Sequence, residues 1–176
     1  MDLALQWLRD HPVLLFAAIA ILPGFAIPSS PLLILAGIVW GPTPTGCALA
    51  LAAIGLNICW THLLAAGPAR KLLIRLIGDR LARFRPAATT SHWKIACALR
   101  LPPGIPLVIQ NYGIGLLGAP LRLSLALAIP TTGIHVCGFV LTGGAILEGR
   151  IALLILGITL LILATILIHT LRKRLA

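Results

Sequence analysis

Residues 28–46 read PSSPLLILAGIVWGPTPTG, and this stretch is the key to the fold. Its centre is apolar, but prolines and glycines interrupt it, so that a straight helix is broken at both ends. The residues that shape the interruption are Pro28, Pro31, Gly37 and Gly41. About 17 residues at a rise of 1.5 Å each barely cross a bilayer once. We therefore predict a re-entrant hairpin, which enters and leaves the membrane through one face.

A second stretch of the same kind, residues 95–120, reads IACALRLPPGIPLVIQNYGIGLLGAP. The PxxP at 28–31 is followed by LLI, the PxxP at 103–106 is followed by LVI, and Gly41 matches Gly118. We interpret the two stretches as an internal repeat rather than as chance in a chain rich in Leu, Ala, Gly and Pro. Inverted repeats with broken helices are typical of membrane transporters.

The composition indicates a membrane protein. Hydrophobic residues make up 59% of the 176 residues and charged residues 10%, whereas a soluble domain carries about 25% charged residues. Polar groups are too few here to cover a soluble surface, so the bilayer is the expected solvent. We predict an all-α integral membrane protein: a helical bundle with two re-entrant hairpins, related as inverted repeats, and about four full transmembrane spans.

The whole chain, 1–176, is expected to form a single membrane domain. Its parts, in order, are an interfacial N-terminus (1–11), a first half (12–67) that contains the hairpin 28–46, a basic loop (68–94), a second half (95–147) that contains the hairpin 95–120, and a last transmembrane helix (151–171).

Charge is distributed unevenly along the chain. There are 14 Lys and Arg against 4 Asp and Glu, a net charge of +10, and most of the basic residues lie in the loop 68–94 and after the last apolar segment. This pattern indicates cytoplasmic loops and contact with anionic lipid headgroups rather than with nucleic acid. Counting spans from an N-terminus inside leaves the basic loop and the C-terminus in the cytoplasm as well. The expected location is a bacterial inner membrane. The expected partners are membrane lipids, and a homo-oligomer is compatible with this arrangement.

Arg100 is the most informative residue, because it lies deep within an apolar stretch. A charged side chain at membrane depth is costly, and it marks a functional site by default. A guanidinium matches a phosphate group with two parallel hydrogen bonds, so an anionic headgroup is the expected ligand. The alternative is an arginine that extends to the membrane surface. Lys94, six residues away, favours that alternative.

Gln110, Asn111 and Tyr112 form a polar group in the middle of the second hairpin. Broken backbone at membrane depth needs hydrogen-bond partners. Two interpretations stay open: Asn111 caps a half-helix, or this tip lines a hydrophilic cavity.

A candidate polar path involves four further residues. Asn57, Thr61 and His62 share one face of a helix, where hydrogen bonding between helices is a simpler role than contact with substrate. His135 follows a pair of threonines on the third span. Its imidazole has a protonatable nitrogen that can couple to a proton, but a histidine satisfied within the core is the commoner case.

Enzyme signatures are missing from the sequence. It has no GxSxG, no HExxH, no phosphate-binding glycine–lysine loop and no paired carboxylates. The four cysteines lie singly in apolar runs and form no CxxC pair, so they predict neither a disulfide framework nor a metal site. We expect no enzymatic activity, no catalytic residue, no metal and no cofactor.

Residues 99–130 resemble the DedA superfamily, also called the VTT domain or SNARE-associated Golgi protein family, and within it the Tvp-type branch. The hairpin of that family carries an Arg, spaced prolines, an Asn with its neighbour, and glycines. Here these positions are Arg100, Pro103, Pro106, Asn111, Tyr112, Gly113 and Gly118. The resemblance covers roughly residues 20–145, and its first half is weaker.

The resemblance implies two facing re-entrant hairpins and movement of lipids between leaflets, as in a scramblase or flippase. Bacterial members with that role act on phosphatidylethanolamine or undecaprenyl phosphate. Proton-coupled members use acidic residues in the first hairpin, whereas this chain has none between Asp10 and Asp79. Coupling through a carboxylate is therefore not expected. The alternatives are a membrane scaffold or assembly factor that transports nothing, and a transporter of small anions.

Overall fold

The computed structural model describes residues 2–82, 91–100 and 105–175. Every regular element within those ranges is a helix, which confirms the all-α fold class. The elements are α1 (Asp2–Asp10), α2 (Pro12–Ile21), the 3₁₀ turn η1 (Leu22–Phe25), α3 (Ser29–Trp40), α4 (Pro44–Ala66), α5 (Arg70–Ala82), α7 (His92–Arg100), α8 (Leu107–Leu116), α9 (Leu121–Glu148) and α10 (Ile151–Leu175).

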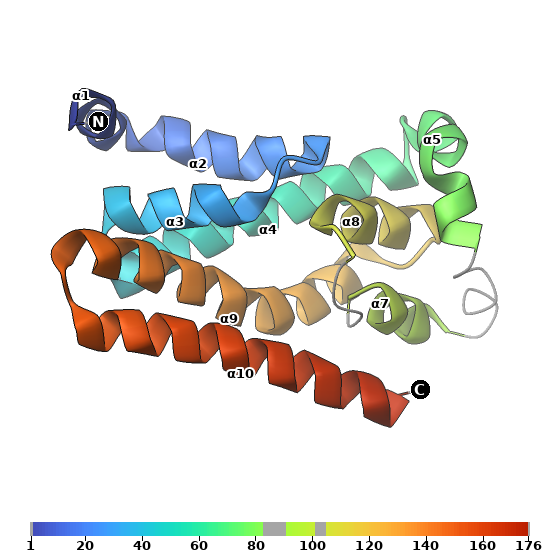
Figure 1. Cartoon of the computed structure of the whole chain (residues 1–176). Helices are drawn as coiled ribbons and strands as arrows, with labels where there is room; N and C mark the ends of the chain where they lie inside the picture. The colour runs from blue at the N-terminus through green and yellow to red at the C-terminus, as the bar shows by residue number, and fades with distance from the viewer. Residues whose placement is uncertain (1, 83–90, 101–104, 176) are drawn as a thin grey trace.

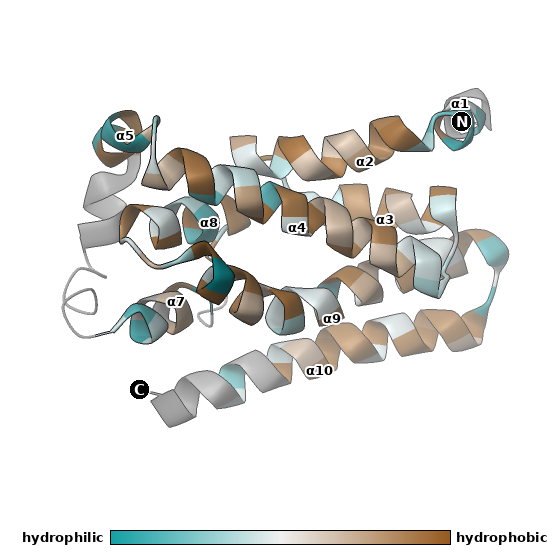
Figure 2. Cartoon of the chain, turned by 180° about the vertical axis from the view of Figure 1, so that it is seen from behind, coloured by the Kyte–Doolittle hydropathy of each residue, from teal (hydrophilic) through white to brown (hydrophobic). Residues whose placement is uncertain are grey.

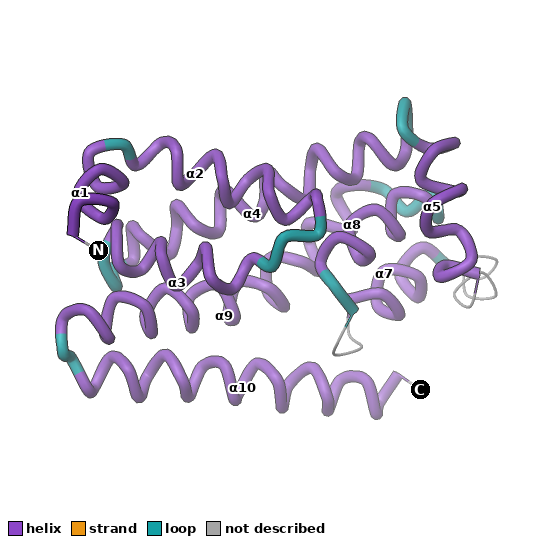
Figure 3. Tube along the Cα trace, turned by 45° about the horizontal axis from the view of Figure 1, so that its top comes forward, coloured by secondary structure: helices purple, strands orange, loops and turns teal. Residues whose placement is uncertain are grey.

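The first half of the chain turns back on itself between α2 and α3. These two short helices run side by side in opposite directions and are joined through η1 (Figures 1 and 3). The sequence explains the break, because Pro23 within η1 has no N–H to continue a helix. The longer helix α4 follows α3 and returns along the bundle (Figure 1).

This position of the reversal differs from the expected one. Residues 29–40 form one unbroken helix, so the stretch 28–46 does not hold both arms of a hairpin; it consists of α3 and the turn into α4. Pro28 is the N-cap of α3, and Pro31 lies in its first turn, where backbone N–H groups have no partner within the helix. These prolines therefore begin a helix instead of breaking one. The expected first span, 12–27, is correspondingly the short first arm of the hairpin.

The second half repeats this order of elements. Helices α7 and α8 form a second pair, and the long helix α9 follows it (Figure 1). Each short second helix is followed by a glycine at positive φ, Gly41 at 81° and Gly118 at 79°. A proline then stands at the start of the long helix, Pro44 in α4 and Pro120 before α9. The two sets of three helices run in opposite directions along the bundle (Figure 1).

The termini lie at opposite ends of the bundle (Figure 1). The N-terminus and α1 are at the end where α9 turns into α10, and the C-terminus is at the end that holds α5 (Figure 1). The sequence-based topology placed both termini on one side. In the bundle, α2 and α3 together form one helical hairpin, whereas the prediction counted residues 12–27 as a full span.

Two helices in the described part of the chain are long and apolar enough to cross a membrane, Pro44–Ala66 and Leu121–Glu148. Shorter apolar helices cover Pro12–Phe25, Ser29–Trp40 and Ile151–Ile166. Figure 2 shows that apolar residues predominate along these helices, and many of their large apolar side chains are exposed. Of the expected four or so full spans, two correspond to helices of sufficient length in the described residues, and the others stay a prediction.

Candidate anion-binding site

Arg100 is buried at the end of α7, with only 4% of its surface exposed. Its Nη2 donates to Asn111 Oδ1 at 3.0 Å and to Ser124 Oγ at 3.3 Å, and its Nη1 donates to Gln110 Oε1 at 3.4 Å. These acceptors come from α8 and α9, so three helices meet at the guanidinium. The alternative in which Arg100 extends to the surface does not hold, since the side chain points into the protein.

The charge of Arg100 has no carboxylate partner among the described residues. The one ion pair found there joins Arg150 Nε to Glu148 at 3.1 Å, in the turn between α9 and α10. All three acceptors around Arg100 are neutral, and its Nε is buried without any acceptor. A buried cation without a counter-charge is unfavourable. The site is therefore chemically suited to an anion.

A chain of hydrogen bonds connects Arg100 to the first hairpin. Asn111 Nδ2 donates to Asn57 Oδ1 at 3.2 Å, and Asn57 Nδ2 donates to the Ala20 carbonyl at 2.8 Å. Trp60 Nε1 donates to the same carbonyl at 2.7 Å. Ala20 lies in the last turn of α2, where carbonyls lack donors within the helix. Because α2 ends here, the Ala20 carbonyl is free to accept hydrogen bonds from two side chains of α4.

A second contact links the two hairpins directly. Tyr112 Oη donates to the Gly24 carbonyl at 3.2 Å, from the middle of α8 to η1. A side chain at Gly24 would collide with the Trp60 ring at 2.3 Å. At Gly115, a side chain would lie 2.8 Å from the His62 carbonyl. Without side chains at these two glycines, η1 and α8 can both pack closely against α4.

The sequence-predicted residues play different roles in this arrangement. Asn111 positions Arg100 and contacts Asn57, so it is not a free helix cap. Gln110 accepts from Arg100 and donates to the Ile105 carbonyl at 2.9 Å. The amide oxygens of both residues thus hold the guanidinium, and their amide nitrogens are already bonded within the protein.

Others of the predicted residues lie near the site or away from it. Gly113 is buried in α8, and Pro106 is the exposed N-cap of that helix. Pro103 lies outside the described residues. The Thr61 hydroxyl donates to the Asn57 carbonyl of its own helix at 2.5 Å. His135 contacts the Thr131 carbonyl at 3.1 Å, about three turns along α9 from the arginine cluster.

Ser124 and Trp60 belong to the site but were not predicted. Ser124 is fully buried and is the one hydroxyl in the first turns of α9. An isolated serine in an apolar helix close in sequence to an intramembrane arginine is a usable signal. Trp60 stands three residues after Asn57, a spacing that places both side chains on one face of α4.

Replacement of Asn57 tests the connection between the hairpins. Asn57→Ala leaves Asn111 Nδ2 and the Ala20 carbonyl each with one partner fewer, and a buried group without a partner costs about 1–3 kcal/mol. We expect a clear drop in the thermal unfolding midpoint of the purified protein, measured by circular dichroism. Thr61→Val is the matched control, since it removes a bond within one helix and should change the midpoint much less.

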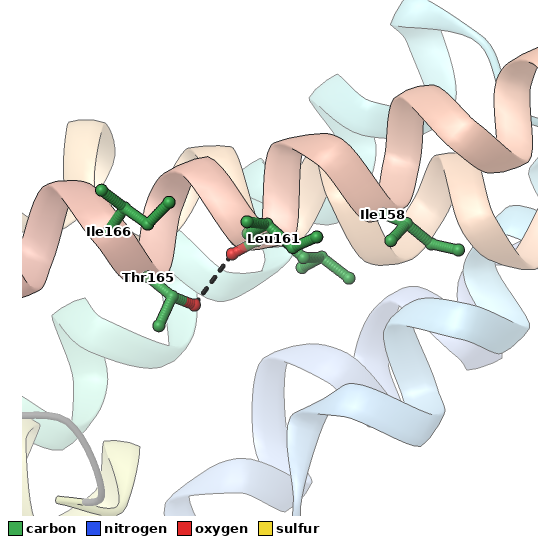
Figure 4. Close-up of a pocket in the computed structure, with 5 residues that line it drawn as sticks. Ile158, Leu161, Thr165 and Ile166 are labelled. Atoms are coloured by element: carbon green, nitrogen blue, oxygen red, sulfur yellow. Dashed lines mark hydrogen bonds between the residues drawn. The ribbon is translucent and has the colours of Figure 1, made fainter.

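An apolar depression lies elsewhere, on α10. It has a volume of about 300 Å³ and is lined by Ile158, Leu161, Ile162, Thr165 and Ile166. Figure 4 shows the Thr165 hydroxyl donating to the Leu161 carbonyl, at 2.8 Å, so its one polar side chain is already bonded. This surface fits an acyl chain better than an anion. The described residues contain no group of three His, Cys, Asp or Glu that could hold a metal ion.

The chain was compared with protein families, curated proteins and solved structures. No protein-family model, curated protein or solved structure matches the chain.

Proposed function

We propose that the chain is an integral membrane protein that moves a phospholipid, or a lipid-linked phosphate carrier, between leaflets. The observation that carries the proposal is the buried Arg100, held by neutral acceptors with its Nε free. A phosphate group supplies the missing negative charge and accepts hydrogen bonds in the geometry that a guanidinium offers.

The exposed apolar surface supports a bilayer environment. Large apolar side chains stand outward on several helices; among the most exposed are Val13, Phe25, Leu63, Ile146 and Ile151. Soluble monomers rarely expose contiguous apolar patches of more than a few hundred Å². In a membrane, by contrast, these faces contact acyl chains and carry no penalty.

The arrangement of the helices supports a transporter. With the long axis of the bundle along the membrane normal, the pairs α2–α3 and α7–α8 are re-entrant hairpins that enter from opposite faces (Figure 1). Their contacts then lie between the two faces: Tyr112 bonds to Gly24 directly, and Asn111 is linked to Ala20 through Asn57 of α4. Broken helices that meet in this way form substrate sites in inverted-repeat transporters.

The same arrangement gives an orientation. Helix α5, which carries Arg70, Lys71 and Arg75, lies at one end together with the C-terminus (Figure 1). The positive-inside rule places that end in the cytoplasm of a bacterial inner membrane. The N-terminus then faces the opposite side, and we propose this orientation in place of one with both termini in the cytoplasm.

Labelling of single cysteines tests this orientation. In a variant without native cysteines, Gln6→Cys should react with a membrane-impermeant maleimide on intact cells, because Gln6 is exposed at the N-terminal end. Arg75→Cys, exposed on α5, should react only after the membrane is permeabilised. Protection of both positions in intact cells would instead restore the topology with both termini inside.

Reconstitution of the purified chain tests the transport itself. Liposomes with fluorescent lipids in both leaflets are expected to lose more than half of their signal to an impermeant quencher when the protein is present, and the rate should depend on the headgroup. Exchange by the purified chain alone also argues against a scaffold. Protein-containing liposomes that keep the inner-leaflet signal for every headgroup would reject the proposal.

A further inference from the structure

Ser124 on α9 has a buried hydroxyl group that contacts Arg100. The residue is fully buried, and its Oγ accepts from Arg100 Nη2 at 3.3 Å. A hydroxyl has one hydrogen to donate as well as lone pairs to accept. In the described part of the chain, the Ser124 hydroxyl has no acceptor for that hydrogen. Several threonines in the helices differ from it, because their hydroxyls donate to the carbonyl four residues earlier; these are Thr61, Thr131, Thr142, Thr165 and Thr170.

Two donors without an acceptor therefore lie next to each other. One is the Ser124 hydroxyl, and the other is Arg100 Nε, which is buried without a hydrogen-bond partner. Nε and Nη2 are bonded to the same guanidinium carbon, so the contact of Ser124 with Nη2 places the hydroxyl beside the group that carries Nε. Most buried polar groups in proteins are hydrogen-bonded. Two such donors at one place therefore indicate a ligand with acceptor oxygens.

The charge around this pair of donors favours a ligand with a single negative charge. Arg100 is the one Lys or Arg among the buried residues that the structure describes, since Lys94 on α7 and Arg122 on α9 are both exposed. Residues 101–104 read LPPG and add no ionisable side chain. His62 is also buried, but an imidazole is largely neutral at alkaline pH. A monoanion neutralises the guanidinium, whereas a dianion would leave one buried charge uncompensated, which is costly.

We propose that Arg100 Nε and the Ser124 hydroxyl donate to one monoanionic phosphodiester, so that the transported lipid is a phospholipid with a diester headgroup. This inference rests on the proposed function and chooses between its two classes of lipid. A phosphodiester has a single negative charge, whereas a phosphomonoester, such as a lipid-linked phosphate carrier, has about 1.5–2 at pH 7. The Ser124 hydroxyl can accept from Nη2 and donate to the phosphate at once, so the ligand displaces no hydrogen bond of the guanidinium.

Binding to the purified full chain in detergent tests the class of ligand. Isothermal titration at about pH 9, where a phosphomonoester is a dianion, compares two short-chain lipids. Dihexanoyl phosphatidylmethanol is a diester, and dihexanoyl phosphatidic acid is the monoester that lacks only its methyl group. The diester should bind at least about tenfold more tightly, because the second charge of the monoester has no partner in the site. Dimethyl phosphate, a soluble diester, is titrated in a third arm to distinguish a lipid headgroup from a free anion.

Three variants test the role of Ser124. Ser124→Ala keeps the guanidinium but removes the hydroxyl, so the affinity for phosphatidylmethanol should fall about tenfold, as expected for one lost hydrogen bond to a charged group. Ser124→Thr keeps a hydroxyl and should retain most of the affinity. Thr131→Val is the matched control and should bind as wild type, because the Thr131 hydroxyl donates to the Leu127 carbonyl of its own helix at 2.6 Å. Unfolding midpoints without ligand establish that each variant is folded.

The outcomes separate the class of ligand, the role of Ser124 and the function. Phosphatidic acid that binds as tightly as phosphatidylmethanol would overturn the assignment to diesters, even if the wild type exchanges lipid. A folded Ser124→Ala protein with wild-type affinity would overturn the role of the hydroxyl. Dimethyl phosphate that binds more tightly than phosphatidylmethanol would overturn the lipid as the ligand. Diester-selective binding in a protein that exchanges no lipid would keep the site and reject the transport function. Failure of the wild type to bind all three compounds would overturn the site.

Discussion

Arg100→Ala is expected to slow lipid exchange in liposomes by about 100-fold or more, close to the rate of protein-free vesicles. Hydrogen bonds to a charged group contribute about 1.5–3 kcal/mol each, and each 1.36 kcal/mol is a factor of ten in rate. Loss of the Nε hydrogen bond to phosphate, together with the positive charge of the guanidinium, therefore removes nearly all of the acceleration of lipid exchange. The measurement is the rate at which an impermeant quencher reaches lipids that start in the inner leaflet.

The fold of the variant must be measured alongside its transport. Removal of the guanidinium leaves Asn111 Oδ1, Gln110 Oε1 and Ser124 Oγ without their donor, so some loss of stability is expected. Arg100→Lys keeps the charge but loses the planar fork, and it should give an intermediate rate. Arg75→Ala removes an exposed arginine on α5 and is the matched control. A folded Arg100→Ala protein with wild-type exchange would show that Arg100 has no part in transport.

The site could be predicted only in part from the sequence. Arg100 and Asn111 were found because polar groups are rare and costly in apolar segments. This signal can be seen at a single position, without knowledge of how the helices pack. The link from Asn111 to Asn57 joins positions 54 residues apart in sequence, and no periodicity specifies such a contact. Ser124 was missed for the same reason, since its role depends on how α7 packs against α9.

The first hairpin shows a different limit. Prolines indicate where a helix is interrupted, but the same residue type also begins helices. Pro28 and Pro31 were interpreted as breaks, whereas they start α3, and the break lies at Pro23. The match between Gly41 and Gly118 was more reliable, because a positive φ at the end of a helix strongly favours glycine.

The packing of α3 against α9 gives the second large effect, on stability. A Cβ atom added at Gly37 would lie 2.0 Å from the Val140 carbonyl oxygen, and one at Gly143 would lie 2.1 Å from the Ile34 carbonyl oxygen. Both obstacles are backbone atoms, which cannot rotate away. Overpacking of a tight core costs about 1–3 kcal/mol per site, and rigid obstacles place these two sites at or above the upper end.

We therefore expect Gly37→Ala and Gly143→Ala each to lower the unfolding midpoint by several degrees. Because both substitutions force the same two helices apart, the midpoint of the double variant should fall by less than the sum of the two single decreases.

Gly55→Ala on α4 is the control, since a Cβ there meets no atom within 4 Å. Alanine at that helical position should stabilise the protein by about 0.5–1 kcal/mol. Unfolding midpoints from circular dichroism in one detergent provide the comparison, and equal midpoints for Gly143→Ala and Gly55→Ala would contradict this packing. The arginine cluster lies on α7, α8 and the start of α9, away from the α3–α9 contact. The glycine variants should therefore lower stability without changing the residues around Arg100.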